Sequence, residues 1–504
     1  MNLADHLPIL PVVLPLLVGV LLITLRNAPP ALQRGASVTA TLALLPLALA
    51  LVQATGDGTH LVYKLGNWEA PYGIVLVADR LAAWMLVTTA LLALFALLYA
   101  LNGADTRGRH FHVLFQLQLF GLNGAFLTGD LFNLFVFFEI LLLASYGLLL
   151  HGGGRQRVKA GLHYVVINLV GSTLFLFAVG TLYGVTGTLN MADLGVKLAA
   201  TPPENLALVQ SAALLLFGVF ALKAALLPLH LWLPAAYAHT SAPVAALFAI
   251  MTKVGAYSIL RVYSLIAGEA AGPLAGLLDA WLVPVALATL ALGMAGALAS
   301  TSLRQQAAYL MVASIGTLMV AFGLGSTEAL AAGLYYLPHT TFAIAALFLL
   351  ADSIAHGRGE WADRFESGPA MPRTHLVGGL FFAVAIAVAG MPPLAGFLGK
   401  VMLLQAAIAS PWMLWVWATV LATGLAGVIA LARSGSLLFY RTHGAHGVIL
   451  TPPSNAALAP TLALLALVVG LVVAAGPLSG HAAAIAAQLK APQHYMDAVL
   501  GGTR

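Results

Sequence analysis

LALVQSAALLLFGVFALKAALLPLHLWLPAA, residues 206–236, is apolar along nearly its whole length. It is longer than the roughly 20 residues that a straight helix needs to cross a bilayer. Pro228 lies in its interior, where a proline removes a backbone hydrogen bond and kinks or breaks a helix. Lys223 lies shortly before that proline. The segment therefore predicts a broken transmembrane helix that carries a charge.

The composition of the whole chain agrees with this prediction. Hydrophobic residues make up 61% of the 504 residues and charged residues 8%, against about 25% charged in an average soluble domain. We therefore expect an all-α polytopic membrane protein with about 14 transmembrane helices, counted in apolar windows of about 20 residues. The expected spans are 7–25, 33–53, 80–101, 112–128, 131–150, 162–185, 207–236, 241–267, 274–298, 303–325, 329–352, 374–408, 412–440 and 457–477.

The absence of cysteine excludes several kinds of site. Disulfides, thiolate zinc sites, iron–sulfur clusters and c-type haem attachment all need cysteine, and the chain has none. We expect no cofactor and no metal here, so any redox chemistry would belong to another subunit. The net charge of +5 is explained by membrane topology and does not indicate a nucleic-acid partner. The first apolar segment has no Lys or Arg before it, which predicts a retained helix rather than a signal peptide.

A second apolar segment, from His375 to Ala409, is also too long for one crossing and contains Gly390-Met391-Pro392-Pro393. The two interrupted segments are the seventh and twelfth spans, and an offset of five gives equivalent helices opposite orientations. This predicts two inverted five-helix repeats, each with a proline-broken helix. The expected regions are 1–111 (helices 1–3), 112–267 (first repeat), 268–440 (second, inverted repeat) and 441–504 (helix 14 and a tail).

The basic residues predict the orientation. Cytoplasmic loops of membrane proteins carry an excess of Lys and Arg. Most of the 22 Lys and Arg residues fall in or beside the odd-numbered loops if the N-terminus is outside. We therefore expect a multi-pass protein of the bacterial inner membrane with both termini in the periplasm.

Four charged residues lie inside expected spans: Glu139, Lys223, Lys253 and Lys400. A central Lys or Asp costs roughly 2.5–3.5 kcal/mol, so the four together cost about 10 kcal/mol unless they are paired or hydrated. Charges kept in a membrane usually mark an ion or proton path. The other interpretations are structural ion pairs or, for the lysines, side chains that reach the membrane surface.

The positions of these charges suggest an order of proton transfer. Burial favours the neutral form of Lys223, whereas a nearby carboxylate such as Glu139 favours the charged form. If the distance between them changes, Lys223 can load and release a proton. Lys253, in the middle of the eighth span, would carry the proton onward. Lys400, beyond the second break, would suit an exit site.

Three histidines are further candidates. His339 follows Pro338 in the eleventh span, His230 lies just after Pro228, and His239 lies in a short cytoplasmic turn. A buried histidine is more often a hydrogen-bonded structural residue than a proton relay, and both interpretations stay open. No two histidines fall at a helical spacing within one span, so paired haem ligands are not expected.

The charged residues belong to longer motifs. These are Val136-Phe137-Phe138-Glu139, the segment 223–234 (KAALLPLHLWLP), the segment 252–257 (TKVGAY), and the segment 390–400 (GMPPLAGFLGK). Together they resemble the proton-translocating membrane subunits shared by respiratory complex I, membrane-bound hydrogenases and multisubunit cation/proton antiporters. The resemblance covers about residues 70–440.

Further motifs resemble one branch of this superfamily, the D-type subunits of the Mrp/Pha-type antiporters. They are the segments 139–153 (EILLLASYGLLLHGG), 161–172 (GLHYVVINLVGS) and 183–191 (YGVTGTLNM). The resemblance implies that Glu139 and Lys223 form a charge pair, that Lys253 is the central relay and that Lys400 is the terminal lysine. Ala235 stands where complex I relatives often carry Asp, and residues 340–346 contain no lysine, unlike some relatives. Both departures favour the antiporter branch, and the second leaves the path from Lys253 to Lys400 to waters, hydroxyls and His339.

The resemblance implies a secondary transporter subunit rather than an enzyme. It would move protons in exchange for Na⁺ or another monovalent cation, as one part of a hetero-oligomeric complex in contact with membrane lipid. A proton-pumping subunit of complex I or of a hydrogenase-type complex is the nearest alternative. An alternative of another class is a scaffold that holds subunits together without conducting ions.

Overall fold

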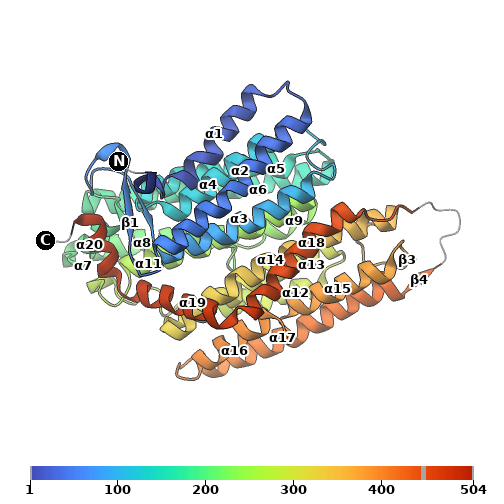
Figure 1. Cartoon of the computed structure of the whole chain (residues 1–504). Coiled ribbons are helices and arrows are strands. Elements are labelled where there is room, and N and C mark those ends of the chain that lie inside the picture. The colour runs from blue at the N-terminus through green and yellow to red at the C-terminus, as the bar shows by residue number, and fades with distance from the viewer. Residues whose placement is uncertain (1–2, 444–449, 502–504) are drawn as a thin grey trace.

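The structure is a computed structural model that describes residues 3–443 and 450–501. Its helices run side by side along a common direction and form one bundle (Figure 1). The α-helices of the described residues are α1 (Leu10–Thr24), α2 (Pro30–Ala54), α3 (Arg80–Ala100), α4 (Phe111–Leu127), α5 (Leu131–Leu150), α6 (Arg155–Thr186), α7 (Met191–Ala199), α8 (Pro203–Ala224), α9 (Trp232–His239), α10 (Ala242–Leu247), α11 (Met251–Ile266), α12 (Leu282–Ala299), α13 (Leu303–Leu324), α14 (Thr327–Arg358), α15 (Thr374–Ala389), α16 (Ala395–Ala407), α17 (Met413–Gly435), α18 (Asn455–Val473), α19 (Ala475–Lys490) and α20 (Pro492–Leu500).

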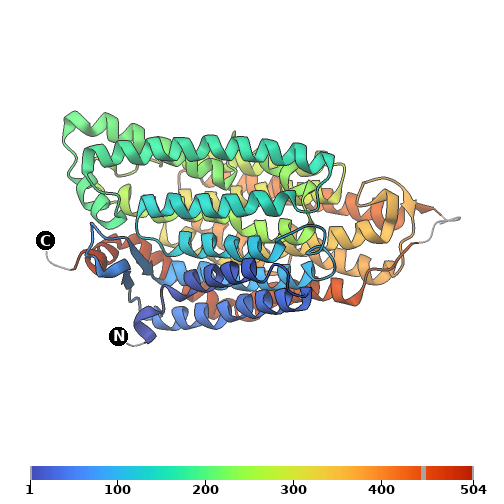
Figure 2. The same ribbon diagram turned by 90° about the horizontal axis from the view of Figure 1, so that it is seen from above.

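The expected fold class, an all-α polytopic membrane protein, is confirmed. In the part of the chain that the structure describes, 11 helices are long and apolar enough to cross a membrane. The shorter apolar helices are α1, α4, α15 and α16. The number of about 14 crossings stays a prediction. The first and last described residues lie at the same end of the bundle (Figure 2).

Both expected helix breaks are present. α8 ends at Ala224 and α9 begins at Trp232, with Pro228 between them. α15 ends at Ala389 and α16 begins at Ala395. In each break the residue that follows the first half-helix has left-handed backbone angles, Ala225 at φ +57° and Gly390 at φ +70°.

The backbone groups that the first break frees find partners inside the bundle. The amide of Leu227 donates to Thr289 Oγ1 of α12 at 2.9 Å. The indole Nε1 of Trp232 donates to the carbonyl of Leu222 at 3.1 Å. This is the condition under which a membrane protein tolerates irregular backbone, because lipid offers no hydrogen-bond partner.

Some expected boundaries were wrong. The span expected to begin at residue 274 becomes helical only at Leu282, because the preceding loop contains Pro273 and two glycines, Gly272 and Gly276, at positive φ. The span expected over 241–267 is confirmed as the candidate membrane span Ala242–Ile266, and a 3₁₀ turn, Phe248–Ile250, divides it into α10 and α11. α6 begins earlier than expected, at Arg155, because the basic residues after the glycine turn form its first turn.

The C-terminal region and several loops contain structure that the hydropathy pattern did not predict. The segment after α18, expected to be a tail, forms α19 and α20. α18 and α19 both pack against α14. Strands β1 (Leu61–Lys64) and β2 (Val75–Ala78) form an antiparallel hairpin. The short strands β3 (Gly368–Pro369) and β4 (Thr442–His443) pair in parallel.

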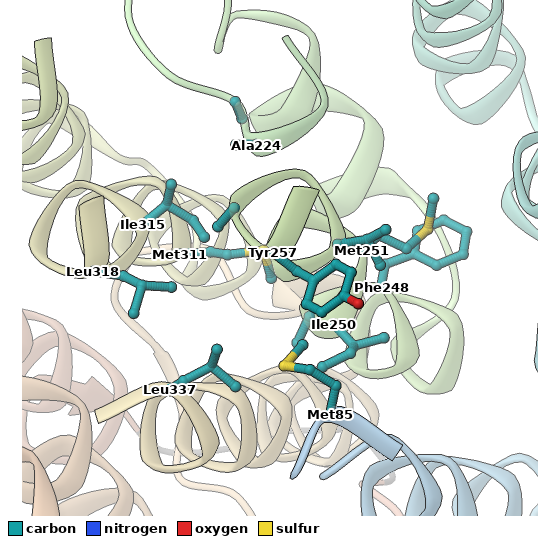
Figure 3. Packing of buried hydrophobic residues seen from close by; sticks show 14 of the residues in the cluster. Met85, Ala224, Phe248, Ile250, Met251, Tyr257, Met311, Ile315, Leu318 and Leu337 are labelled. Carbon is teal, nitrogen blue, oxygen red and sulfur yellow. The ribbon is translucent and has the colours of Figure 1, made fainter. Parts of the chain in front are cut away.

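The centre of the bundle is formed by α14 and the α10–α11 pair. All residues in the apolar window of Thr327–Trp361 are buried, as are 94% of those in Ala242–Ile266. α10 packs directly against α14, so the last helices of the expected first repeat meet the middle of the second. Figure 3 shows the apolar packing around α11, with Tyr257 among side chains of α3, α13 and α14. Of these central helices, α11 carries Lys253 and α14 carries His339.

Candidate functional site

Lys223 lies in the last turn of α8, immediately before the first break. Its side chain is buried, and Nζ donates to Oδ1 of Asn168, on α6, at 3.1 Å. The C-terminal end of a helix carries a partial negative charge that stabilises a cation. The lysine therefore has a neutral side-chain partner and a favourable helix end in place of water.

Glu139 is on α5 and is partly buried. It accepts a hydrogen bond from Oγ of Ser172, which is also on α6. Asn168 and Ser172 are four residues apart, so they lie on one face of that helix. Among the described residues Glu139 and Lys223 form no direct ion pair. Both predicted partners, Glu139 and Lys223, thus contact α6, but each is hydrogen-bonded to a different side chain of that helix.

Lys253 is completely buried in α11. Its Nζ has no hydrogen-bond partner among the residues that the structure describes. α11 packs closely on the end of α8, because a Cβ placed on Gly255 would overlap the backbone of Lys223 and Ala224. The glycine therefore brings the helix of Lys253 against the turn that carries Lys223.

The second break holds Lys400 and His339 on neighbouring carbonyls. Nζ of Lys400 donates to the carbonyl of Ala389 at 2.8 Å, and Nε2 of His339 lies 3.1 Å from the carbonyl of Ala387. The last carbonyls of a helix lack the usual amide partner four residues on. The carbonyl of Ala387 also accepts from the amide of Gly390 at 3.0 Å, and a carbonyl oxygen has two lone pairs for these contacts. A Cβ on Gly396 would overlap the imidazole of His339, so only glycine permits this approach.

A small polar cavity adjoins the same residues. Its volume is about 30 Å³, and a buried water needs about 10–15 Å³ together with several polar partners. The polar lining residues are Ser314, Thr317, Tyr336, His339, Thr340, Lys400 and Thr423. The cavity therefore has the size and the lining to hold water between α13, α14 and α16.

The other two histidines do not join this cluster. His230 is buried inside the first break, and its Nδ1 has no hydrogen-bond partner among the described residues. His239 ends α9, and its carbonyl accepts a hydrogen bond from Arg157. Burial lowers the pKa of His239 from its ordinary value. The structure connects neither side chain to a lysine.

One buried charge was missed in the sequence. Arg261, two turns after Lys253 on α11, is buried and lies 2.6 Å from both carboxylate oxygens of Asp79. Its guanidinium also lies over the rings of Tyr257 and Tyr495, 5.7 Å and 5.2 Å from their centroids. Asp79 in turn caps α3 by accepting from the amide of Ala82. This arginine is fully paired, which indicates a structural ion pair.

The hydroxyl and amide side chains beside the lysines were also missed as site residues. Asn168 and Ser172 bind Lys223 and Glu139. Tyr336 and Thr340 line the cavity beside Lys400. A signal was present for α6, because Asn168 and Ser172 recur four residues apart within an apolar span. That spacing places them on one face but does not say which helix the face contacts.

Comparison with known proteins agrees with this architecture. The family described as "NADH:quinone oxidoreductase/Mrp antiporter, TM" matches residues 128–426, which include Glu139, Lys223, Lys253 and Lys400. The chain is also similar to a solved structure titled "Structure of Mrp complex from Dietzia sp. DQ12-45-1b". The TM-score is 0.87 and the identity 30%, over 99% of this chain and 100% of the other.

Two curated relatives cover almost the whole chain. One is the D-type subunit of a "Probable K(+)/H(+) antiporter" of Rhizobium meliloti, 43% identical over 99% of this chain and 98% of the relative. Another is the D-type subunit of an "Na(+)/H(+) antiporter" of Alkalihalophilus pseudofirmus, 34% identical over 98% and 99%. The chain therefore belongs to the NADH:quinone oxidoreductase/Mrp antiporter family of membrane subunits, as a homologue of the D-type antiporter subunits.

Proposed function

We propose that this chain is the proton-translocating subunit of a multisubunit antiporter that exchanges H⁺ for a monovalent cation. The observation that carries the proposal is the series of lysine side chains along the bundle, with Lys223 and Lys253 buried and Lys400 partly buried. Each lies on or beside the end of a broken helix or the 3₁₀ interruption before α11. The relatives named as K⁺/H⁺ and Na⁺/H⁺ antiporter subunits support a transporter rather than an enzyme.

The proposed route begins at Glu139 and Lys223 and continues through Lys253 to His339 and Lys400. The packing of α11 on the end of α8 supports the first step, and the packing of α10 on α14 supports the passage between the two repeats. The polar cavity supports water-assisted transfer between His339 and Lys400. His230 is retained as a candidate beside the first break.

The proposed regions and orientation follow from the same elements. Residues 112–267 and 268–440 would be inverted repeats, each containing one broken helix, flanked by regions 1–111 and 441–504. The bacterial inner membrane is the proposed location, with both termini in the periplasm. The position of both described chain ends at one end of the bundle supports a shared side (Figure 1). A phosphatase fused after residue 504 should be active, and an inactive fusion would contradict this orientation.

The decisive experiment replaces the lysine at the first break. In everted vesicles that contain the complete complex, Lys223→Ala should abolish cation-dependent proton flux while all subunits still co-purify. Lys197→Ala is the matched control, because Lys197 pairs with Asp193 on the short helix α7. Near wild-type exchange in Lys223→Ala would contradict the lysine relay.

The nearest alternative is a proton-pumping subunit of a redox complex, since the family description includes NADH:quinone oxidoreductase. Purification of the intact complex separates the two. A redox complex would show flavin or iron–sulfur absorbance in the partner subunits, whereas an antiporter complex would show cation-driven exchange without added electron donor.

A further inference from the structure

Helix α6 places a polar face between the two charges of the first repeat. Tyr164, Asn168 and Ser172 recur every four residues, and all three are buried. The opposite face exposes apolar side chains such as Leu169 and Phe177, which are 60% and 64% exposed. Such a face is suited to lipid or an apolar subunit surface. The buried polar side chains of α6 thus gather where the helix meets Lys223 and Glu139.

The orientation of the Asn168 amide is fixed by a second hydrogen bond. Its Nδ2 donates to the carbonyl of Tyr164 at 2.8 Å, and a carbonyl can only accept. Oδ1 must therefore face Lys223, whose Nζ lies 3.1 Å away. An amide oxygen accepts from an ammonium and from a neutral amine alike. Asn168 can therefore hold the lysine in either charge state.

Ser172 holds the carboxylate in a complementary way. Its hydroxyl has a single hydrogen, and this hydrogen is donated to Oε1 of Glu139. Residues four apart on a helix have their Cβ atoms about 5–6 Å apart. Lys223 and Glu139 are therefore held one helical turn from each other, on separate partners.

Close packing keeps this arrangement in place. Gly171 lies between the two polar residues, and a Cβ there would lie 3.0 Å from Cδ2 of Leu222 and 3.9 Å from Cε of Lys223. α6 and α8 also pack along each other. The position of Asn168 relative to Lys223 is therefore set by helix packing rather than by a flexible side chain.

We propose that Asn168 and Ser172 are positioning residues that keep the Glu139–Lys223 pair open until the lysine leaves the amide for the carboxylate. The proposal rests on the proposed function and adds to it the partners that hold the open state. In this open state the partner of Lys223 is the neutral amide of Asn168, so no negative charge in contact with the amine holds its proton. Closing the pair then requires exchange of one hydrogen bond for another, over about one helical turn.

Other titratable groups do not supply this control. The titratable and charged side chains on the elements around Lys223 are Glu139 and Tyr146 on α5, Arg155, Arg157, Lys159, His163, Tyr164 and Tyr183 on α6, Lys253, Tyr257, Arg261 and Tyr263 on α11, and His230 in the break. Among these described residues Glu139 is the one carboxylate. A carboxylate introduced at position 168 would therefore be a new charge beside Lys223.

The test uses two substitutions with opposite expected effects, in the complete complex in everted vesicles. Asn168→Asp should hold Lys223 as ammonium and move the pH of half-maximal exchange upward by about one unit or more. Asn168→Leu should leave the amine of Lys223 without a partner and move the pH of half-maximal exchange downward. Exchange is expressed per assembled complex, so a lower yield of one variant does not change the comparison.

The hydroxyl is tested by loss and rescue. Ser172→Ala should lower exchange about tenfold, the effect of a hydrogen bond to a charged group, and Ser172→Thr should restore it. Thr173→Ala is the matched control, because that hydroxyl is exposed and donates to the carbonyl of Leu169 on its own helix.

Unchanged pH profiles in both Asn168 variants, or shifts in the same direction, would overturn this inference. The proposed function would then still stand if Lys223→Ala loses exchange. Retained exchange in Lys223→Ala would instead remove the proposed function itself, so the two failures are distinguishable.

Discussion

Each of the two helix breaks has a lysine near the C-terminal end of its first half-helix, but the two lysines come from opposite sides of their breaks. Lys223 comes before its break and occupies the last turn of α8. Lys400 comes after its break, on α16, and reaches back to the carbonyl of Ala389, the last residue of α15. Both lysines are therefore associated with the C-terminal end of the first half-helix, where the helix dipole favours a cation.

The partners of the two amines differ, and this difference suggests different roles. Lys223 is hydrogen-bonded to the side chain of Asn168 on α6. The carboxylate of Glu139 is bound one helical turn away, by Ser172 on the same face of that helix. Lys400 has a backbone carbonyl, and the polar lining of its cavity includes His339 but no carboxylate among the described residues. A backbone carbonyl cannot change its charge. We therefore expect the first break to act as the switch and the second as the end of the route.

Lys223→Ala, at the first break, should abolish exchange, and the next largest effect should come from removing the amine of the second break. Lys400→Ala should lower cation-driven proton exchange about 100-fold, because a positioned proton-transfer group contributes about 10²–10⁴-fold. Lys490→Ala is the control, since that lysine is exposed and pairs with Glu269, and surface pairs contribute about 0–1 kcal/mol. Exchange above half of the wild-type rate in Lys400→Ala would mean that the second break carries no proton.

A smaller effect is expected from neutralising the carboxylate of the first break. Glu139→Gln keeps an acceptor for Ser172 but removes the charge that would attract Lys223, so exchange should fall about tenfold, the equivalent of one pKa unit. Glu269→Gln is the control, and both are measured as proton flux per assembled complex. If Glu139→Gln lowers the yield of assembled complex but leaves the flux per complex unchanged, the result would support the scaffold interpretation and contradict the proposed switch.

The smallest effects concern the left-handed residues at the two breaks. Ala225 adopts φ +57°, which costs a residue with a Cβ about 1–2 kcal/mol, whereas Gly390 adopts φ +70° without that cost. Ala225→Gly should therefore raise stability by about 1 kcal/mol. Gly390→Ala should lower it by a similar amount and also displace Lys400, because the new Cβ would lie 2.9 Å from Nζ.

Thermal unfolding of the purified complex measures both substitutions at the breaks. Effects of the same sign would show that the two breaks are not conformationally equivalent. A fall in exchange with Gly390→Ala but not with Ala225→Gly would sharpen the difference between them.

Much of the site could be predicted because its signals are local. Pro228 and Pro392-Pro393 marked both breaks because they lie in apolar segments too long for one crossing. A proline alone is not sufficient, since Pro338 lies inside the continuous helix α14. A charge in an apolar window is costly in any fold, so Glu139, Lys223, Lys253 and Lys400 were visible as candidates. Their roles in proton transfer remain predictions.

The partners of those charges could not be predicted in the same way. Asp79 and Arg261 form a buried ion pair across 182 positions of sequence, and no local pattern joins residues so far apart. The start of α12 was misplaced because hydropathy does not show that the glycines of its loop adopt positive φ. The segment after α18 resembles a tail in its hydropathy because α19 gains its stability from packing on α14 rather than from length or apolar content.

The amino-acid order therefore specified a helical membrane bundle with two broken helices and four costly charges, since each depends on residues within one span. Which side chain meets each charge depends on how the helices rotate and pack. α6 turns Asn168 to Lys223 and Ser172 to Glu139, and α15 offers its last carbonyls to His339 and Lys400. These contacts join different helices, and helix packing is a property of the whole bundle rather than of any segment.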